Sequence, residues 1–171
     1  EGVTSSLVHL EIAAEVMSGL LRAGAPLDRE HLWPINKRYN DGQGAAFASQ
    51  LGTLVGAVST NAEENDFFFE KDVIFSSKTY EAMGEGKQLT FSLGELARMA
   101  TKMMGGILTR RLRISTVRAL LRAMGNGDKL SALYKAYPDT PEGFSAWCQQ
   151  ADALWQQCGT MADALMTAVD A

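Results

Sequence analysis

The stretch from residue 140 to residue 170 reads TPEGFSAWCQQADALWQQCGTMADALMTAVD and carries the strongest secondary-structure signal in the chain. Thr140, Pro141 and Glu142 form a typical helix start: a capping residue, a proline at the first position and an acid in the first turn. Apolar residues then recur with a period of about 3.6 residues, which places them on one stripe of a helix. They are Phe144, Trp147, Cys148, Ala151, Leu154, Trp155, Cys158, Met161, Ala162, Leu165 and Val169. The pattern predicts a long amphipathic C-terminal helix.

Helical signals also dominate the rest of the chain. Periodic or capped segments predict helices at residues 7–21, 29–39, 43–58, 61–71, 80–83, 92–104, 115–124 and 129–137. Small residues in the 43–58 segment suit close packing against a neighbouring helix, and Val73-Ile74-Phe75 is the only stretch that suggests a strand. We therefore expect an all-α fold, a compact bundle-like domain of about seven helices.

Four residue patterns predict where these helices start, stop or bend. Ser92 and Glu95 have the spacing of a capping box, and Gly105-Gly106 are expected to end the helix that this box opens. Pro34 disfavours the helical conformation at Trp33, so the 29–39 segment is expected to begin extended or kinked. The three consecutive phenylalanines at 67–69 cannot share one helix face, so at least one of them must have a different partner.

Composition limits the class of protein. A chain of 171 residues with 46% hydrophobic and 21% charged residues is typical of one soluble globular domain. It has no apolar run of about 20 residues that could span a bilayer, and its start does not resemble a signal peptide. Cys148 and Cys158 lie about 15 Å apart along one predicted helix, so they cannot pair within it. We expect two reduced core thiols and a cytoplasmic protein.

Common catalytic and metal-binding patterns are missing from the sequence. The two histidines, His9 and His31, have no cysteine or histidine at zinc-site spacing, and no P-loop, G-x-S-x-G elbow or complete G-x-G-x-x-G occurs. His9 is expected to contact Glu11 or a backbone carbonyl. The sequence therefore assigns no catalytic residue and no metal ligand, and its acidic balance argues against nucleic-acid binding.

Charge is distributed unevenly along the chain. The formal net charge is −4, yet residues 96–127 contain seven basic residues and no acidic one. Arg110, Arg111 and Arg113 are candidates for binding a phosphate group or an anionic membrane surface, which would make the protein peripheral to a membrane. Alternatively, the basic residues of this segment pair with acidic side chains elsewhere in the chain, such as Glu63, Glu64, Asp66 and Glu70. Met99, Met103, Met104 and Ile107 nearby form either a soft apolar ligand surface or part of the core.

The first residues resemble part of a cofactor site. Gly2-Val3-Thr4 precede further hydroxyl residues, Ser5-Ser6, that can cap a helix whose N–H groups would face an anionic ligand. A plain helix cap is the alternative.

These residues also carry a family resemblance. The chain resembles the C-terminal part of FAD-dependent oxidoreductases of the geranylgeranyl reductase type, in which a glycine-x-glycine-isoleucine stretch and a helix with Ala-Ala-Glu close the flavin domain. Gly2-Val3, Leu7 and Ala13-Ala14-Glu15 match this pattern, and residues 32–39 resemble the block that follows it. The resemblance spans about residues 2–125 and is specific mainly in the first 75. The first glycine of the motif is absent, and His9-Leu10 replace a Ser-Gly pair.

The resemblance implies that the chain consists of two parts. Residues 1–24 would be a remnant of the helix that closes the flavin domain, and residues 25–171 a helical C-terminal domain. Gly2, Val3 and Thr4 would contact FAD in the full-length parent, which would reduce isoprenoid double bonds, while this chain alone would be non-catalytic and hold no FAD tightly. Its partners would be the missing N-terminal FAD domain or a second copy bound through an exposed first helix. The alternatives are a stand-alone interaction or apolar/anionic ligand-binding module, and a helical sensor or scaffold.

Overall fold

All secondary structure in the described residues is helical. The computed structural model describes residues 2–54, 60–73, 76–85, 87 and 90–169, with the backbone alone for residues 2, 83 and 160–169. The elements are α1 (Gly2–Ala23), α2 (Arg29–Tyr39), a π-helical segment η1 (Asn40–Gly44), α3 (Ala45–Leu54), α4 (Ala62–Glu70), α5 (Ser77–Gly84), α6 (Leu93–Leu108), α7 (Ile114–Lys135), a 3-10 turn η3 (Pro141–Gly143) and α8 (Phe144–Val169). The expected all-α class is confirmed. Of the suggested strand, Val73 is a buried residue outside any strand, and residues 74–75 lie outside the described residues.

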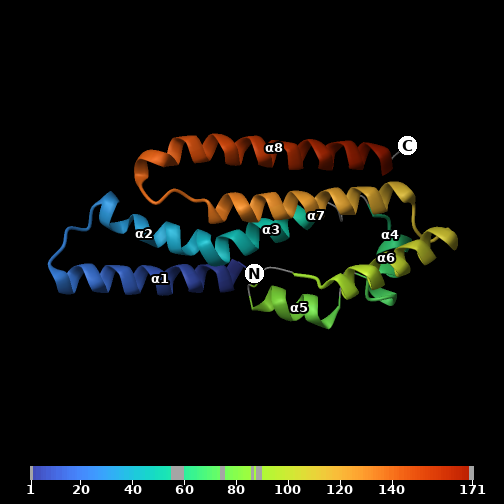
Figure 1. Cartoon of the computed structure of the whole chain (residues 1–171), viewed down its shortest axis with the longest axis horizontal. Coiled ribbons are helices and arrows are strands. Elements are labelled where there is room, and N and C mark those ends of the chain that lie inside the picture. The colour runs from blue at the N-terminus through green and yellow to red at the C-terminus, as the bar shows by residue number, and fades with distance from the viewer. Residues whose placement is uncertain (1, 55–59, 74–75, 86, 88–89, 170–171) are drawn as a thin grey trace.

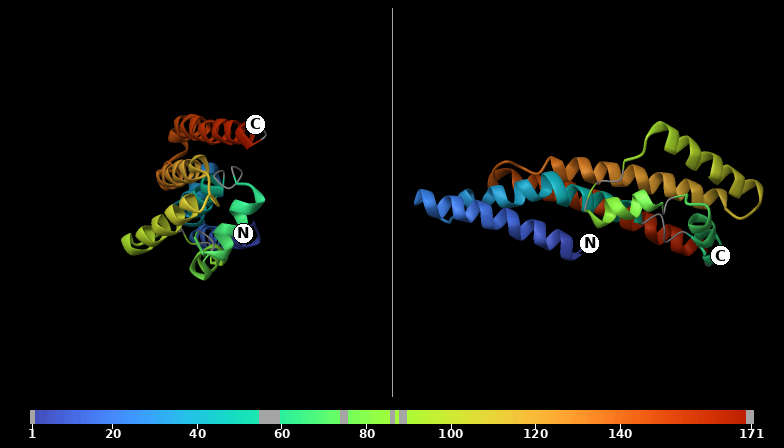
Figure 2. Two further views of the ribbon diagram at one scale, coloured as in Figure 1. Left: turned by 90° about the vertical axis from the view of Figure 1, so that its right-hand side faces the viewer. Right: turned by 90° about the horizontal axis from the view of Figure 1, so that it is seen from below.

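The helices form an elongated bundle (Figure 1). Helix α1 lies along one long edge and α8 along the other, with the α2–η1–α3 rod and α7 between them. Helices α4, α5 and α6 gather at the end of the molecule away from the α1–α2 turn, as the views in Figure 2 also show. The molecule therefore has a four-layer helical body and a smaller helical cluster at one end.

Helix α2 is helical on both sides of its proline. It is one continuous helix with Pro34 inside it, and Asp28 caps its first turn by accepting a hydrogen bond from the His31 backbone N–H at 3.0 Å. Trp33 is held from another part of the chain, because its indole N–H donates to the Pro138 carbonyl at 2.8 Å and its ring stacks on Tyr137. The expected extended start is thus wrong: the cap and the tertiary contacts of Trp33 outweigh the local preference.

Two glycines allow α3 and α7 to cross at very short range. A Cβ atom on Gly127 would lie 2.6 Å from the backbone oxygen of Ser49, and one on Gly52 would lie 3.1 Å from the Cα of Gly127. The close packing expected for this helix is therefore confirmed. The two separate helices expected at 115–124 and 129–137 are a single helix, because Gly127 serves this contact and does not end the helix.

The glycine pair in α6 also lies within a helix. Helix α6 continues past Gly105 and Gly106 to Leu108, so the expected stop at Met104 is wrong. A Cβ on Gly106 would lie 2.7–2.8 Å from Leu112 and Phe67 side-chain atoms. A larger residue at this position would therefore clash with those two side chains. The helix ends just beyond, and Arg110 follows with φ +60°, the left-handed conformation.

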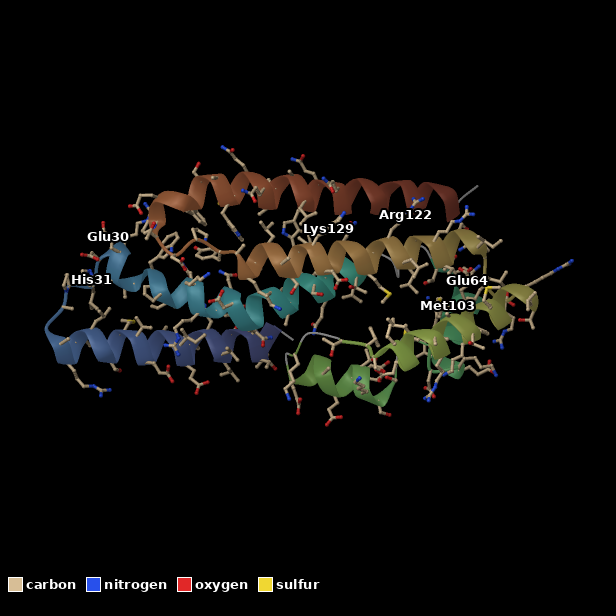
Figure 3. The ribbon with its side chains drawn as sticks, viewed as in Figure 1. Glu30, His31, Glu64, Met103, Arg122 and Lys129 are labelled. Atoms are coloured by element: carbon tan, nitrogen blue, oxygen red, sulfur yellow. The ribbon has the colours of Figure 1, made fainter. Side chains whose placement is uncertain are left out.

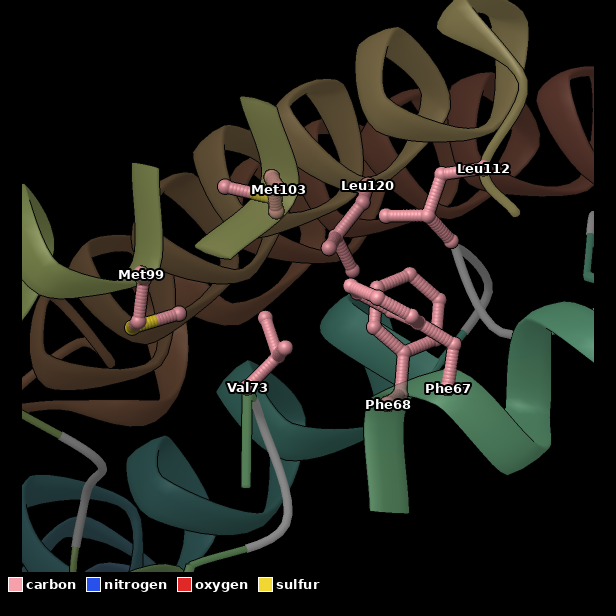
Figure 4. Packing of buried hydrophobic residues seen from close by; sticks show 7 residues of the cluster. All are labelled: Phe67, Phe68, Val73, Met99, Met103, Leu112 and Leu120. Atoms are coloured by element: carbon pink, nitrogen blue, oxygen red, sulfur yellow. The ribbon is translucent and has the colours of Figure 1, made fainter. Parts of the chain in front are cut away.

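The cluster at this end encloses an apolar core (Figure 4). Phe67 and Phe68 of α4 are buried in it while Phe69 is exposed, which confirms that the three rings do not share a face. Met99 and Met103 are core residues, as the packing alternative predicted, whereas Met104 is exposed. The cluster consists of Phe67, Phe68, Val73, Met99, Met103, Leu112 and Leu120.

Helix α8 packs along α7 through the part of the predicted stripe that precedes residue 160, whereas the side chains of Met161, Ala162, Leu165 and Val169 lie outside the description. The indole N–H of Trp147 donates to the Leu133 carbonyl at 2.9 Å, and that of Trp155 donates to the Tyr134 hydroxyl at 3.3 Å. Cys158 is buried against this interface. Both cysteines are free thiols, but only Cys158 is the core residue that was expected, because Cys148 is half-exposed.

Helix α1 begins earlier than its sequence pattern suggested. It starts at Gly2, so the hydroxyl residues 4–6 lie inside the helix and do not cap it. Ser5 is buried and bonds the Tyr39 hydroxyl, and the His9 ring lies 4.9 Å from the Tyr39 ring. The partner expected for His9, Glu11 or a backbone carbonyl, is therefore replaced by an aromatic ring of α2.

Candidate functional site

A cavity of about 410 Å³ opens between α3, α6 and α7. Its apolar wall consists of Phe91, Leu96 and Met99 on one side and Leu120 and Met124 of α7 on the other. Its polar wall comes from Ser49, Gln50, Thr53, Thr90 and Asp128. A mainly apolar cavity of this size with a few polar groups is the usual form of a small-molecule site.

Gln50 is the most informative residue of the cavity wall. Its side chain is only 4% exposed, and its amide nitrogen donates to the Lys87 carbonyl at 3.2 Å. That bond fixes the orientation of the amide, because a carbonyl can only accept. The amide oxygen, Oε1, is buried and finds no hydrogen-bond donor among the described residues. Buried polar atoms almost always have a partner, so this acceptor marks a place that no donor in the described part of the chain fills.

A second, more polar cavity of about 340 Å³ adjoins the first. Phe91 and Met99 line both cavities, and the second one is also lined by Lys78, Arg98 and Lys102. The Lys102 ammonium donates to the carbonyls of Lys71 and Asp72. It has no acidic side-chain partner among the described residues, nor does Arg98. Asp72 and Glu95 also line the second cavity, so its lining carries three basic and two acidic side chains.

The third cation of this cavity is neutralised. The Lys78 ammonium lies 2.7 Å from a Glu95 carboxylate oxygen. This hydrogen bond from Lys78, followed by those from Ser92, lowers the pKa of Glu95 to about 2. Glu95 also completes the predicted capping box with Ser92. Lys78 therefore stabilises the start of α6 and is less available to bind a ligand.

Two of the three predicted anion-binding arginines are engaged in ion pairs. Arg111 lies 2.8 Å from a Glu70 oxygen and over the ring of Phe67, and its hydrogen bond lowers the pKa of Glu70 to about 2. Arg113 lies 2.8 Å from a Glu64 oxygen. For these two residues the geometry favours the intramolecular alternative. Arg110 is exposed and has no ion pair in the described part of the chain, and an anion site at the three arginines stays a prediction.

Glu64 is the centre of that ion-pair region. It is 2% exposed and lies with Met103 near the meeting point of α4 and α6, far from Glu30 and His31 at the other end of the molecule (Figure 3). Burial alone would raise the pKa of this carboxyl. Hydrogen bonds from Arg113, Thr116 and the Asn61 backbone outweigh burial and hold the pKa below its usual value. Glu64 is thus an ionised structural carboxylate with its oxygens fully occupied.

The predicted flavin-contacting residues lie at the N-terminal end of α1, which Figure 1 places near the middle of the long axis and beside α5. Gly2, Val3 and Thr4 form the first turn of α1, and none of them lines either cavity. Val3 is exposed. Their role toward FAD stays a prediction.

Sequence reasoning missed Gln50 and Arg98. The only available signal for Gln50 was a polar residue in a segment of small and apolar residues, which does not show whether its amide is satisfied. Arg98 was counted in the basic segment, but its position in the second cavity depends on contacts between segments that are distant in sequence.

We also looked for metal sites and membrane-spanning helices among the described residues. No cluster of three potential metal ligands occurs in the described part of the chain, and no helix there is long and apolar enough to cross a membrane. A scan against models of protein families, a search of curated proteins and a search of solved structures found no match to the chain. A functional proposal therefore depends on the two cavities and on the residues of α1.

Proposed function

We propose that the chain binds an amphipathic small molecule in the two adjoining cavities. The apolar part of the ligand occupies the α3–α6–α7 cavity, and an anionic group lies beside Arg98 and Lys102. The observation that carries this proposal is the buried amide oxygen of Gln50, which lies in the polar wall of the cavity and has no donor among the described residues. An unsatisfied buried acceptor costs about 1–3 kcal/mol, which a ligand hydroxyl or N–H group would recover.

The shared wall of Phe91 and Met99 supports one ligand spanning both cavities. A thioether and an aromatic ring accommodate flexible apolar groups well. The basic side chains that line the second cavity, Lys78, Arg98 and Lys102, outnumber its acidic ones, which favours an anion at the polar end. The ligand class is an elongated apolar molecule with a hydrogen-bond donor and a separate negative charge.

Calorimetric titration with 12-hydroxydodecanoate tests this proposal, because that probe has a donor, an apolar chain and a carboxylate. Dodecanoate lacks the donor and 1,12-dodecanediol lacks the charge, so each should bind about tenfold more weakly, a difference of about 1.4 kcal/mol. Gln50→Met should abolish the preference for the hydroxyl group, and Arg98→Gln the preference for the carboxylate. Arg118→Gln is the control, because Arg118 is exposed and lines neither cavity.

Cavity filling gives an independent test. Met124→Trp should block binding, whereas Met104→Trp, at an exposed methionine outside the cavity, should not. Equal affinity for all three probes, unchanged by these variants, would show that the cavities are not the binding site.

A second candidate is the helical C-terminal domain of a flavin-dependent oxidoreductase of the geranylgeranyl reductase type. It is favoured by the matching residues in α1 and α2, and by the exposed apolar residues of α1, which a flavin domain could cover. In that setting the isolated chain binds FAD weakly or not at all, because the phosphate-binding loop belongs to the missing domain. Stoichiometric quenching of flavin fluorescence at micromolar FAD would contradict that expectation. An upstream reading frame that encodes a Gly-rich βαβ unit would favour this candidate.

A further inference from the structure

Helix α1 is apolar on two opposite sides. Its inner side includes Val8, Ile12 and Val16, which are half-buried where α1 packs on α2. Its outer side is exposed along the whole helix. The large apolar residues there, with their exposed fractions, are Val3 (76%), Leu7 (61%), Leu10 (65%), Met17 (40%) and Leu21 (64%). We call these five residues and Ala14 the outer stripe.

The spacing of the outer stripe identifies the kind of surface that it fits. Successive members are separated by four, three, four, three and four residues, with Ala14 filling the one small position. This alternation is the a/d pattern of a coiled-coil seam, in which each residue inserts between four residues of a facing helix. A flat sheet or a lipid surface needs no such regular spacing. The outer stripe therefore fits a second helix aligned with α1 over its full length.

We propose that the facing helix is α1 of a second copy of this chain, in antiparallel orientation. In such a pair Leu10 faces Ala14, Leu7 faces Met17 and Val3 faces Leu21, and each match occurs twice because a two-fold interface is self-complementary. The Leu10–Ala14 match sets a large side chain against a small one, the arrangement that fills a helix interface without voids.

The area of the outer stripe is sufficient for a weak dimer. Its exposed apolar side chains amount to about 500 Å² per copy, so a pair buries about 1,000 Å², the lower range of specific interfaces. We expect a dissociation constant in the micromolar range. Figure 1 shows that α1 lies at an outer edge of the molecule, where a second copy can approach.

Charged neighbours of the outer stripe add a further expectation. Glu11 is exposed beside the seam, and in an antiparallel pair the two copies bring their Glu11 carboxylates near the two-fold axis. Like charges facing one another weaken the pair. Glu11→Gln should therefore strengthen the dimer several-fold.

Sedimentation velocity of the whole chain from about 1 µM to about 500 µM tests the proposal. We expect a monomer–dimer equilibrium that Leu10→Glu weakens at least tenfold and Glu11→Gln strengthens. Leu93→Glu is the matched control, because Leu93 is a highly exposed leucine on α6, and it should leave the equilibrium unchanged. Urea unfolding at low concentration should show the same stability for Leu10→Glu and wild type, which separates a lost interface from a lost fold.

A wild-type chain that stays monomeric over the whole range would overturn the proposal and leave the outer stripe to a different partner, such as a flavin domain. A dimer that Leu10→Glu does not weaken, or that Glu11→Gln does not strengthen, would also overturn it.

Discussion

Glu64 connects the start of α4 to the start of α7 through Arg113. Its two carboxylate oxygens accept hydrogen bonds from the backbone N–H, Nε and Nη2 of Arg113, at 2.9, 3.1 and 2.8 Å. The same carboxylate accepts from the Asn61 backbone N–H in the capping box of α4, and from the Thr116 hydroxyl. One buried side chain therefore fixes two helix ends and the loop before α7.

Replacing Glu64 should be among the most damaging single changes in the chain. We expect Glu64→Ala to lower the free energy of unfolding by about 2–3 kcal/mol, because it removes a buried ion pair and a helix cap while half-exposed Arg113 can still be hydrated. Urea unfolding followed by circular dichroism measures the change. Glu63→Ala, at an exposed neighbour, is the control and should shift stability by less than about 0.5 kcal/mol. Similar losses for both variants would mean that Glu64 has no special role.

Stability should fall in acid because the fold lowers the pKa values of several carboxyls, including those of Asp28 and Glu142. The pKa of Glu64 lies below its usual value of 4.5, and those of Glu70 and Glu95 are about 2. A carboxyl with a lower pKa in the folded state stabilises the fold above the unfolded pKa, and this contribution is lost as pH falls toward the folded value. We therefore expect the free energy of unfolding to decline from about pH 4.5 toward pH 2. The triple variant Glu64→Gln, Glu70→Gln, Glu95→Gln should show a much shallower decline in the same urea titrations.

Gly125 and Gly127 allow a matched comparison within α7. Gly127→Ala should destabilise the protein by about 2 kcal/mol or more, because the new methyl group would lie 2.6 Å from the Ser49 carbonyl oxygen. Gly125→Ala has open space around its Cβ and should stabilise the helix by about 0.5–1 kcal/mol. Thermal unfolding of both variants measures the difference. Two shifts of the same sign would argue against the α3–α7 crossing.

The two thiols should react at different rates. Burial raises the pKa of the Cys158 thiol, whereas Cys148 is half-exposed on α8. Because the thiolate is the reactive form, a disulfide reagent such as Ellman's should modify Cys148 first and Cys158 only on unfolding. Cys148→Ala should remove the fast phase and Cys158→Ala the slow one. A fast phase that survives in Cys148→Ala would show that α8 opens readily.

Local signals predicted more of the fold than of the site. The capping box at Ser92 and Glu95 could be recognised in the sequence because all its hydrogen bonds lie within four residues. The expectation that Gly106 stops a helix was wrong. A glycine is needed there because the side chains of Leu112 and Phe67 leave no room for a Cβ atom, and Phe67 is distant in sequence. The cavity at Gln50 was invisible for the same reason: whether a buried amide has a partner depends on three helices and not on its neighbours along the chain.

The π-helical segment between α2 and α3 sets the rotational phase of one helix against the other. The Ala45 backbone N–H bonds the carbonyl five residues back, at Asn40, so the segment holds one residue more than an α-helical turn would. Because the wider turn absorbs that extra residue, deleting one residue within it would leave α2 and α3 nearly in phase. Deleting a residue of α3 before Gly52 would instead turn the rest of that helix by about 100°. Trp33 would still face Pro138 and Tyr137, but Gly52 would no longer face Gly127. The π-helical segment is therefore the place in this rod where the chain can lose a residue while α3 stays packed on α7.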